Sequence, residues 1–139
     1  MQRVFIDTGA YIALTDRSDQ HHIEATKLAQ HISANHLRRV TTNYVLLEAY
    51  TWIRRRLGHT AVTTFGTSIH RDIRRGRMTV VYVNQSLDKA GWDIMRKYHD
   101  QEFSFVDCVS FAWLNQNSSV EVFAFDQHFM WMGFPNVSG

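Results

Sequence analysis

VFIDTGAYIAL, residues Val4 to Leu14, is the stretch of this 139-residue chain that decides its fold. Apolar side chains surround its single carboxylate, Asp7, and Gly9 follows closely enough to keep the strand short. The stretch predicts a buried strand over 3–7 and a helical turn over 10–14. A carboxylate taken out of water without a partner costs several kcal/mol, so Asp7 is expected to be paired, protonated or bound to a metal.

Three other apolar stretches carry an acid in the same way. YVLLEAYTWI contains Glu48, FSFVDCVSFAWL contains Asp107, and VEVFAFD ends at Asp126. The other nine of the thirteen acidic residues lie in polar or mixed surroundings, and none of the four apolar runs places a Lys or Arg next to its acid. If the fold brings the four acids together, their repulsion makes a divalent cation the natural partner. An oxygen-only set of ligands favours Mg²⁺ or Mn²⁺ over zinc.

Predicted strands and helices alternate along the rest of the chain. Strands are expected over 38–41, 78–83 (a buried one) and 121–125, and helices over 20–35, 43–57, 60–75, 86–98 and 105–117. The expected helix N-caps are Ser18 or Asp19, Asn43, a residue within 84–86, and Ser104. This order predicts one α/β domain over 1–139, with a central, mainly parallel sheet of four to five strands flanked by helices.

That plan places the acids where a site forms in such folds. Asp7 and Asp126 fall at the carboxyl ends of strands, where open parallel sheets bind their ligands. Asp107 lies in the first turn of a helix, whose dipole favours an anion, and Glu48 lies one turn into another helix. The four carboxylates could therefore converge. His128, two residues after Asp126, could reach the same pocket or a phosphate.

Composition narrows the class of protein. Acids or arginines interrupt every apolar run before it reaches the roughly 20 residues of a membrane span, and the first residues do not form a signal peptide. The single cysteine, Cys108, cannot form an internal disulfide and is expected to be buried, which fits a cytoplasmic protein. If the four site acids are left out of the count, the chain has fifteen basic and nine acidic residues. Twelve of the fifteen are arginines, which suit phosphate oxygens, although helix ends also favour arginine.

In order and spacing these motifs resemble the PIN-domain ribonucleases, and specifically the VapC-type toxins of toxin–antitoxin pairs. The resemblance runs from Val4 to Phe134. It rests on DTGA at the first acid, TTNYVLLEAYTWIRRRLG around the second, FSFVDCVSFA around the third and AFDQHF at the fourth, with a final Gly133-Phe134.

The resemblance implies a Mg²⁺- or Mn²⁺-dependent endoribonuclease with one or two ions. The catalytic, metal-binding acids would be Asp7, Glu48, Asp107 and Asp126, supported by Thr8 and Ser104. The reaction would be hydrolysis of an RNA phosphodiester by a water, leaving a 3′-hydroxyl and a 5′-phosphate. Arg54, Arg55 and Arg75 are candidate RNA contacts.

The resemblance also implies partners. VapC-type toxins usually dimerise and bind a cognate antitoxin, whose basic side chain can enter the acidic pocket. The apolar run 129–132 (FMWM) is expected to be partly covered in a dimer or by a partner. Two alternatives remain open at this point: a non-toxin PIN nuclease of RNA processing, and a catalytically silent RNA-binding PIN module.

Two other classes fit less well. DTGA is also the signature of aspartic proteases, but those are almost entirely β, whereas here helices follow the motif. A phosphate-accepting receiver domain needs a paired acid before the strand-end Asp and a lysine on a later strand. The three lysines of this chain, Lys27, Lys89 and Lys97, do not supply it.

Overall fold

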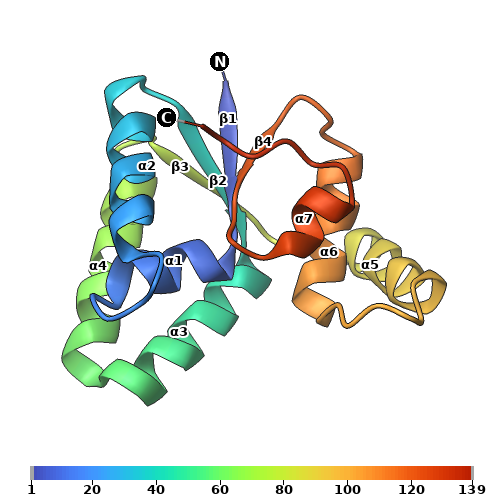
Figure 1. Ribbon diagram of the computed structural model, residues 1–139, viewed down its shortest axis with the longest axis horizontal. Helices are drawn as coiled ribbons and strands as arrows, with labels where there is room; N and C mark the ends of the chain where they lie inside the picture. Colours follow the sequence, from blue (N-terminus) through green and yellow to red (C-terminus); the bar gives the residue numbers. More distant parts are fainter. Residues whose placement is uncertain (1, 139) are drawn as a thin grey trace.

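Four short strands form the centre of the computed structural model, which describes residues 2–138 (Figure 1). They are β1 (Arg3–Ile6), β2 (Arg38–Thr42), β3 (Met78–Val81) and β4 (Glu121–Phe123). Their order in the sheet is β3-β2-β1-β4, and every neighbouring pair is parallel. Because parallel strands point the same way, their carboxyl ends meet at one edge of the sheet. The predicted parallel α/β architecture is confirmed.

Helices cover both faces of this sheet (Figure 1). In chain order they are α1 (Thr8–Thr15), α2 (His22–Ala34), α3 (Asn43–Leu57), α4 (His59–Arg74), α5 (Gln85–Lys97), α6 (Phe105–Asn115) and α7 (Gln127–Trp131). Figure 1 shows α2 and α4 on one side of the sheet and α5 and α6 on the other, with α1 and α3 near the carboxyl ends of the strands. No helix in the described part of the chain is long and apolar enough to cross a membrane.

Helix α6 is the most deeply buried helix and fixes one of the site acids. Every residue from Asp107 to Leu114 is buried, and Cys108 is completely inaccessible, as predicted. Helix α5 packs closely on α6 because Gly91 has no side chain. A Cβ at Gly91 would lie 2.6 Å from Cγ2 of Val109 and 3.0 Å from its Cα. The first turn of α6 is therefore held firmly.

Two predicted helix caps are wrong by a few residues. Helix α2 starts at His22, and neither Ser18 nor Asp19 caps it; Asp19 Oδ1 instead accepts the His21 N–H at 2.8 Å in the turn before the helix. The cap of α3 is Thr42, whose Oγ1 accepts the N–H of Val45 at 3.1 Å. The caps predicted within 84–86 and at Ser104 are confirmed, since Asn84 and Ser104 cap α5 and α6.

The strand prediction also needs correction at the two sides of the sheet. The strand predicted over 78–83 ends at Val81 and is an edge strand, with Met78 buried but Thr79 exposed. The strand predicted over 121–125 ends at Phe123, because the chain turns toward α7, a helix that the sequence did not predict. Asp126 is therefore the N-cap of α7, three residues beyond the end of β4.

Candidate active site

The four candidate acids all lie beyond the carboxyl ends of the strands or on the helices next to them. Asp7 directly follows β1 and occupies the N-cap position of α1. Its backbone N–H donates to the carbonyl of Phe123 at 3.1 Å, so the ends of β1 and β4 are tied together. Asp126 follows β4, Asp107 lies in the first turn of α6, and Glu48 lies on α3. The fold thus gathers side chains that are far apart in the sequence.

Asp7 is the most strongly perturbed of the four. Its residue is only 4% exposed, and Oδ1 has no hydrogen-bond partner among the described residues. Burial raises the pKa of Asp7 from its ordinary 3.8 to about 8. The negative charge of Asp107 adds to this effect, the backbone N–H of Thr8 opposes it, and the charges of Glu48 and Asp126 add smaller amounts. The side chain is therefore protonated at neutral pH unless a cation offsets the cost of its charge.

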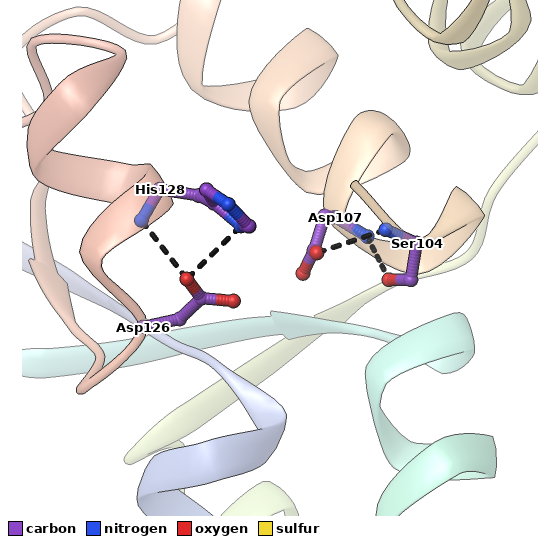
Figure 2. A network of polar contacts seen from close by, with 4 residues as sticks. All are labelled: Ser104, Asp107, Asp126 and His128. Carbon is purple, nitrogen blue, oxygen red and sulfur yellow. Dashed lines mark hydrogen bonds and ion pairs between the residues drawn. The ribbon is translucent and has the colours of Figure 1, made fainter. Parts of the chain in front are cut away.

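Asp107 is held by a capping box (Figure 2). Its Oδ2 accepts the backbone N–H of Ser104 at 3.1 Å, and its own N–H donates to Ser104 Oγ at 3.0 Å. Burial raises the pKa of Asp107, and the Ser104 hydrogen bond partly opposes the shift. With Oδ2 engaged, Oδ1 is the oxygen left to receive a ligand. Figure 2 shows the carboxylates of Asp107 and Asp126 pointing toward one another.

Asp126 and His128 form the exposed side of the cluster. Asp126 Oδ1 accepts the backbone N–H of His128 at 2.9 Å and lies 3.1 Å from the ring Nδ1 of the same residue. The side chains are 38% and 30% exposed, respectively. Asp107, Asp126 and His128 each offer one donor atom, and the three atoms lie within 4.8 Å of one another. His128 was absent from the predicted set of site residues, although its spacing from Asp126 had suggested that it could reach the pocket.

Glu48 lies on α3, in the wall of a surface groove. The groove has a volume of about 450 Å³ and is lined mainly by α3, with Val106 from α6. Glu48 lies in its wall with Trp52 and Arg55. Its charge raises the pKa of both Asp7 and Asp107, which places it within electrostatic range of both.

The remaining predicted residues fall in different places. Thr8 starts α1 next to Asp7, is 6% exposed, and its Oγ1 has no hydrogen-bond partner among the described residues. Arg54 is exposed on the last turn of α3, and Arg55 lines the groove. Arg75 follows α4 and precedes β3, so it lies at the amino-terminal edge of the sheet, away from the acids. The fold thus places Thr8 next to Asp7 and Arg55 in one groove with Glu48, and it separates Arg75 from the acids.

The chemistry of this pocket fits a divalent cation. In the described part of the chain no Lys or Arg nitrogen lies within 4.0 Å of a carboxylate oxygen of Asp7, Glu48, Asp107 or Asp126. Asp7 Oδ1 is buried without a hydrogen-bond partner, and Asp107 Oδ1 faces Asp126. Buried acids that repel one another and lack a cationic side chain are best compensated by a metal ion with oxygen ligands.

Comparison with known proteins agrees with this architecture. The PIN domain family matches residues 4–134 of the chain. The chain is 30% identical over 134 residues to the 23S rRNA-specific endonuclease VapC20 of Mycobacterium tuberculosis, found in two strains, covering 96% of this chain and 97% of the relative. The chain also superposes on the crystal structure of M. tuberculosis VapC20, described as a sarcin–ricin loop cleaving toxin, with a TM-score of 0.81. The two sequences are 29% identical, and the match covers 96% of this chain and 98% of that one. The chain therefore belongs to the PIN domain family, and within it to the VapC-type endoribonuclease toxins.

Proposed function

We propose that this chain cleaves ribosomal RNA at an exposed loop, using Mg²⁺ or Mn²⁺ held by Asp7, Glu48, Asp107 and Asp126. The observation that carries the proposal is the buried carboxylate of Asp7, whose Oδ1 has no hydrogen-bond partner among the described residues and whose pKa is raised by burial and by the other three acids. A protein gains nothing in stability from such a group, so its presence points to a ligand. Similarity to a 23S rRNA-specific endonuclease supports RNA as the substrate.

Each side chain has a separate task in this proposal. Asp7 supplies a rigid oxygen ligand, because its backbone is fixed between β1 and β4. Ser104 holds Oδ2 of Asp107, which directs Oδ1 into the site. When bound, a divalent cation polarises the phosphodiester and lowers the pKa of a water. One of the more exposed carboxylates, Glu48 or Asp126, then accepts a proton from the attacking water. The bond between phosphorus and the 3′-oxygen breaks, and the released oxygen takes a proton from solvent, which leaves a 3′-hydroxyl and a 5′-phosphate.

The substrate contacts follow from the shape and charge of the surface. Arg55 lies in the same groove as Glu48, so it is positioned to hold a phosphate next to the scissile one. Arg54, on the same exposed turn, extends this contact. Arg75 would meet RNA only if the substrate extends to the opposite edge of the sheet.

The proposal includes two protein partners and a cytoplasmic location, where the ribosome is. A cognate antitoxin would control the activity, and a second copy of the chain would complete a homodimer. Exposed apolar side chains support a covered surface: Met130 is 64% and Trp131 58% exposed, whereas Phe129 of the same run is buried. Light scattering of the purified chain, with and without the protein encoded beside it, tests both partners. A monomer that binds no neighbouring gene product would contradict this part.

RNA cleavage by matched variants tests the central proposal. The substrates are a hairpin with the sarcin–ricin loop sequence and a scrambled hairpin of equal length. We expect the wild type to cut the first hairpin when Mg²⁺ or Mn²⁺ is present, chelator to stop the reaction, and Asp7→Asn and Asp107→Asn to be inactive. Asp93→Asn is the control, because this exposed acid on α5 pairs only with Lys89 at 3.4 Å. Full activity of Asp7→Asn and Asp107→Asn would refute the assignment of the site. Equal cleavage of the scrambled hairpin by the wild type would refute only the choice of loop.

A further inference from the structure

The imidazole of His128 lies at the exposed side of the acid cluster, and its Nδ1 makes no hydrogen bond in the described part of the chain. Its Nδ1 is 3.1 Å from Asp126 Oδ1, yet this nitrogen is buried and has no hydrogen-bond partner among the described residues. A separation of 3.1 Å is short enough for a hydrogen bond, so the angles between the two groups are what exclude one. The two atoms are close without meeting the geometry of a hydrogen bond. Two arrangements fit such a distance: an ion pair when the imidazole is protonated, and a metal ion bound by both atoms.

Two ligands of one metal ion have this relationship. Donor atoms about 2.1 Å from an octahedral ion stand about 3.0 Å apart at adjacent positions, with both lone pairs directed at the ion rather than at each other. The 3.1 Å between Nδ1 and Oδ1 matches that spacing. Donor atoms of Asp107, Asp126 and His128 lie within 4.8 Å of one another, so the three side chains form a group that could hold one ion.

The fold holds the ring in this position from two directions. Asp126 Oδ1 accepts the backbone N–H of His128 at the start of α7, which fixes the backbone beside the carboxylate (Figure 2). The buried ring of Phe103 meets the imidazole edge to face, with centroids 4.9 Å apart and planes at 77°. A side chain that merely filled surface space would not need both restraints.

We infer that His128 is a further metal ligand, which joins Asp107 and Asp126 through its imidazole Nδ1. This inference rests on the proposed metal-dependent function. A nitrogen donor in an otherwise carboxylate site changes which ion the site prefers. Mg²⁺ binds oxygen ligands almost exclusively, whereas Mn²⁺ accepts imidazole more readily, so His128 shifts the preference of the site toward Mn²⁺.

Pulsed electron paramagnetic resonance of the RNA-free, full-length protein loaded with Mn²⁺ tests the inference directly. A nitrogen bound to Mn²⁺ produces a ¹⁴N modulation that carboxylates cannot produce. We expect this modulation in the wild type and its loss in His128→Phe, which keeps an aromatic ring against Phe103 but removes both nitrogens. The control His99→Phe makes the same replacement on an exposed turn after α5 and should keep the signal.

Metal affinity supplies a second readout. His128→Phe should weaken Mn²⁺ binding by about tenfold or more, in the range found when groups of a metal site are removed, and weaken Mg²⁺ binding less. If His128→Phe does not fold, His128→Gln replaces it, since its amide oxygen leaves no coordinated nitrogen. Absence of ¹⁴N modulation in the wild type, or its persistence in the folded variant, would overturn the inference.

The same data separate this inference from the proposed function. If the wild type binds Mn²⁺, Asp107→Asn abolishes binding and His128→Phe changes nothing, then only the role of His128 is refuted. If the wild type binds neither Mn²⁺ nor Mg²⁺, the metal-dependent function and the inference both fail.

Discussion

Replacing Asp7 by asparagine should stabilise the metal-free protein and abolish its activity. Burial and the neighbouring acids raise the pKa of Asp7 from 3.8 to about 8. Between these values the folded state holds a proton that the unfolded state has released, so the free energy of unfolding falls as the pH rises. Each pKa unit corresponds to about 1.4 kcal/mol, so the loss accumulated by pH 8 is on the order of 5 kcal/mol. Asparagine does not titrate, so the free energy of unfolding of Asp7→Asn does not fall with pH in this way.

The pH dependence is the sharper measurement. The difference in unfolding free energy between Asp7→Asn and the wild type should grow by about 1.4 kcal/mol per pH unit between pH 5 and pH 7, and more slowly as the pH approaches the folded-state pKa of about 8. Asparagine brings its own cost, because its amide is buried where Asp7 Oδ1 already lacks a partner, but that cost does not vary with pH. Urea unfolding in chelator at pH 5, 6.5 and 8 gives the slope. Asp107, whose pKa is raised in the same direction, stays in both proteins and does not remove the difference.

Saturating Mg²⁺ should reverse the order. A bound cation favours the ionised form of Asp7, so it stabilises the wild type and stabilises Asp7→Asn much less. Asp93→Asn, an exposed acid paired with Lys89, should follow the wild type throughout. A stability difference between Asp7→Asn and the wild type that is the same at pH 5 and pH 8 in chelator would refute the reasoning, because Asp7 would then be solvated or paired.

Three further substitutions test the support of the site and its approach. Ser104→Ala removes the hydroxyl that accepts the Asp107 N–H at 3.0 Å. We expect it to lower the free energy of unfolding in urea by about 1 kcal/mol and to reduce RNA cleavage. Unchanged cleavage would show that Asp107 needs no positioning by Ser104. Gly91→Ala places a Cβ 2.6 Å from Val109 and should destabilise the fold by roughly 1–3 kcal/mol. In the control Gly66→Ala the nearest neighbour of the new Cβ would be Tyr50 at 3.6 Å, so this variant should be neutral or more stable than the wild type. Equal melting temperatures of the two variants would contradict the tight packing of α5 on α6. Arg55→Ala should weaken RNA binding and reduce the steepness of log affinity against log salt concentration by about one. Arg75→Ala, at the opposite edge of the sheet, should weaken RNA binding less. A larger loss of RNA affinity in Arg75→Ala than in Arg55→Ala would place the RNA elsewhere on the surface.

The sequence was most informative where one physical conflict dominated. A carboxylate within an apolar run is costly wherever the run is buried, so Asp7 and Asp107 stood out without any knowledge of the fold, and both are buried. The parallel sheet followed from near-continuous apolar strands between helices. These features depend on neighbours along the chain, which the sequence displays directly.

The errors arose where distant contacts choose between similar local options. Thr42 and Asn43 are both good helix caps, but the side chain of Asn43 accepts the N–H of Val83 at 2.8 Å, and Thr42 caps α3 instead. The strand over Met78–Val81 has the composition of a buried strand but lies at the sheet edge, and strand order is a tertiary property. Helix α7 has five residues, too few to show a helical period.

The unequal burial of the acids indicates what a cation would do in the proposed metal-dependent site. Asp7 is almost inaccessible, Asp107 is 9% exposed, and the side chain of Asp126 is 38% exposed, so the cost of a negative charge falls along this series. An arginine could pair with Asp126 at the surface, but placing its long side chain beside Asp7 would fill the space that a phosphate must enter. A small divalent ion compensates the buried charge and leaves that space open. Because the deepest acid would gain most from the ion, we expect Asp7 to couple metal binding to stability, and we expect the exposed pair of Asp126 and His128 to adjust which ion is bound.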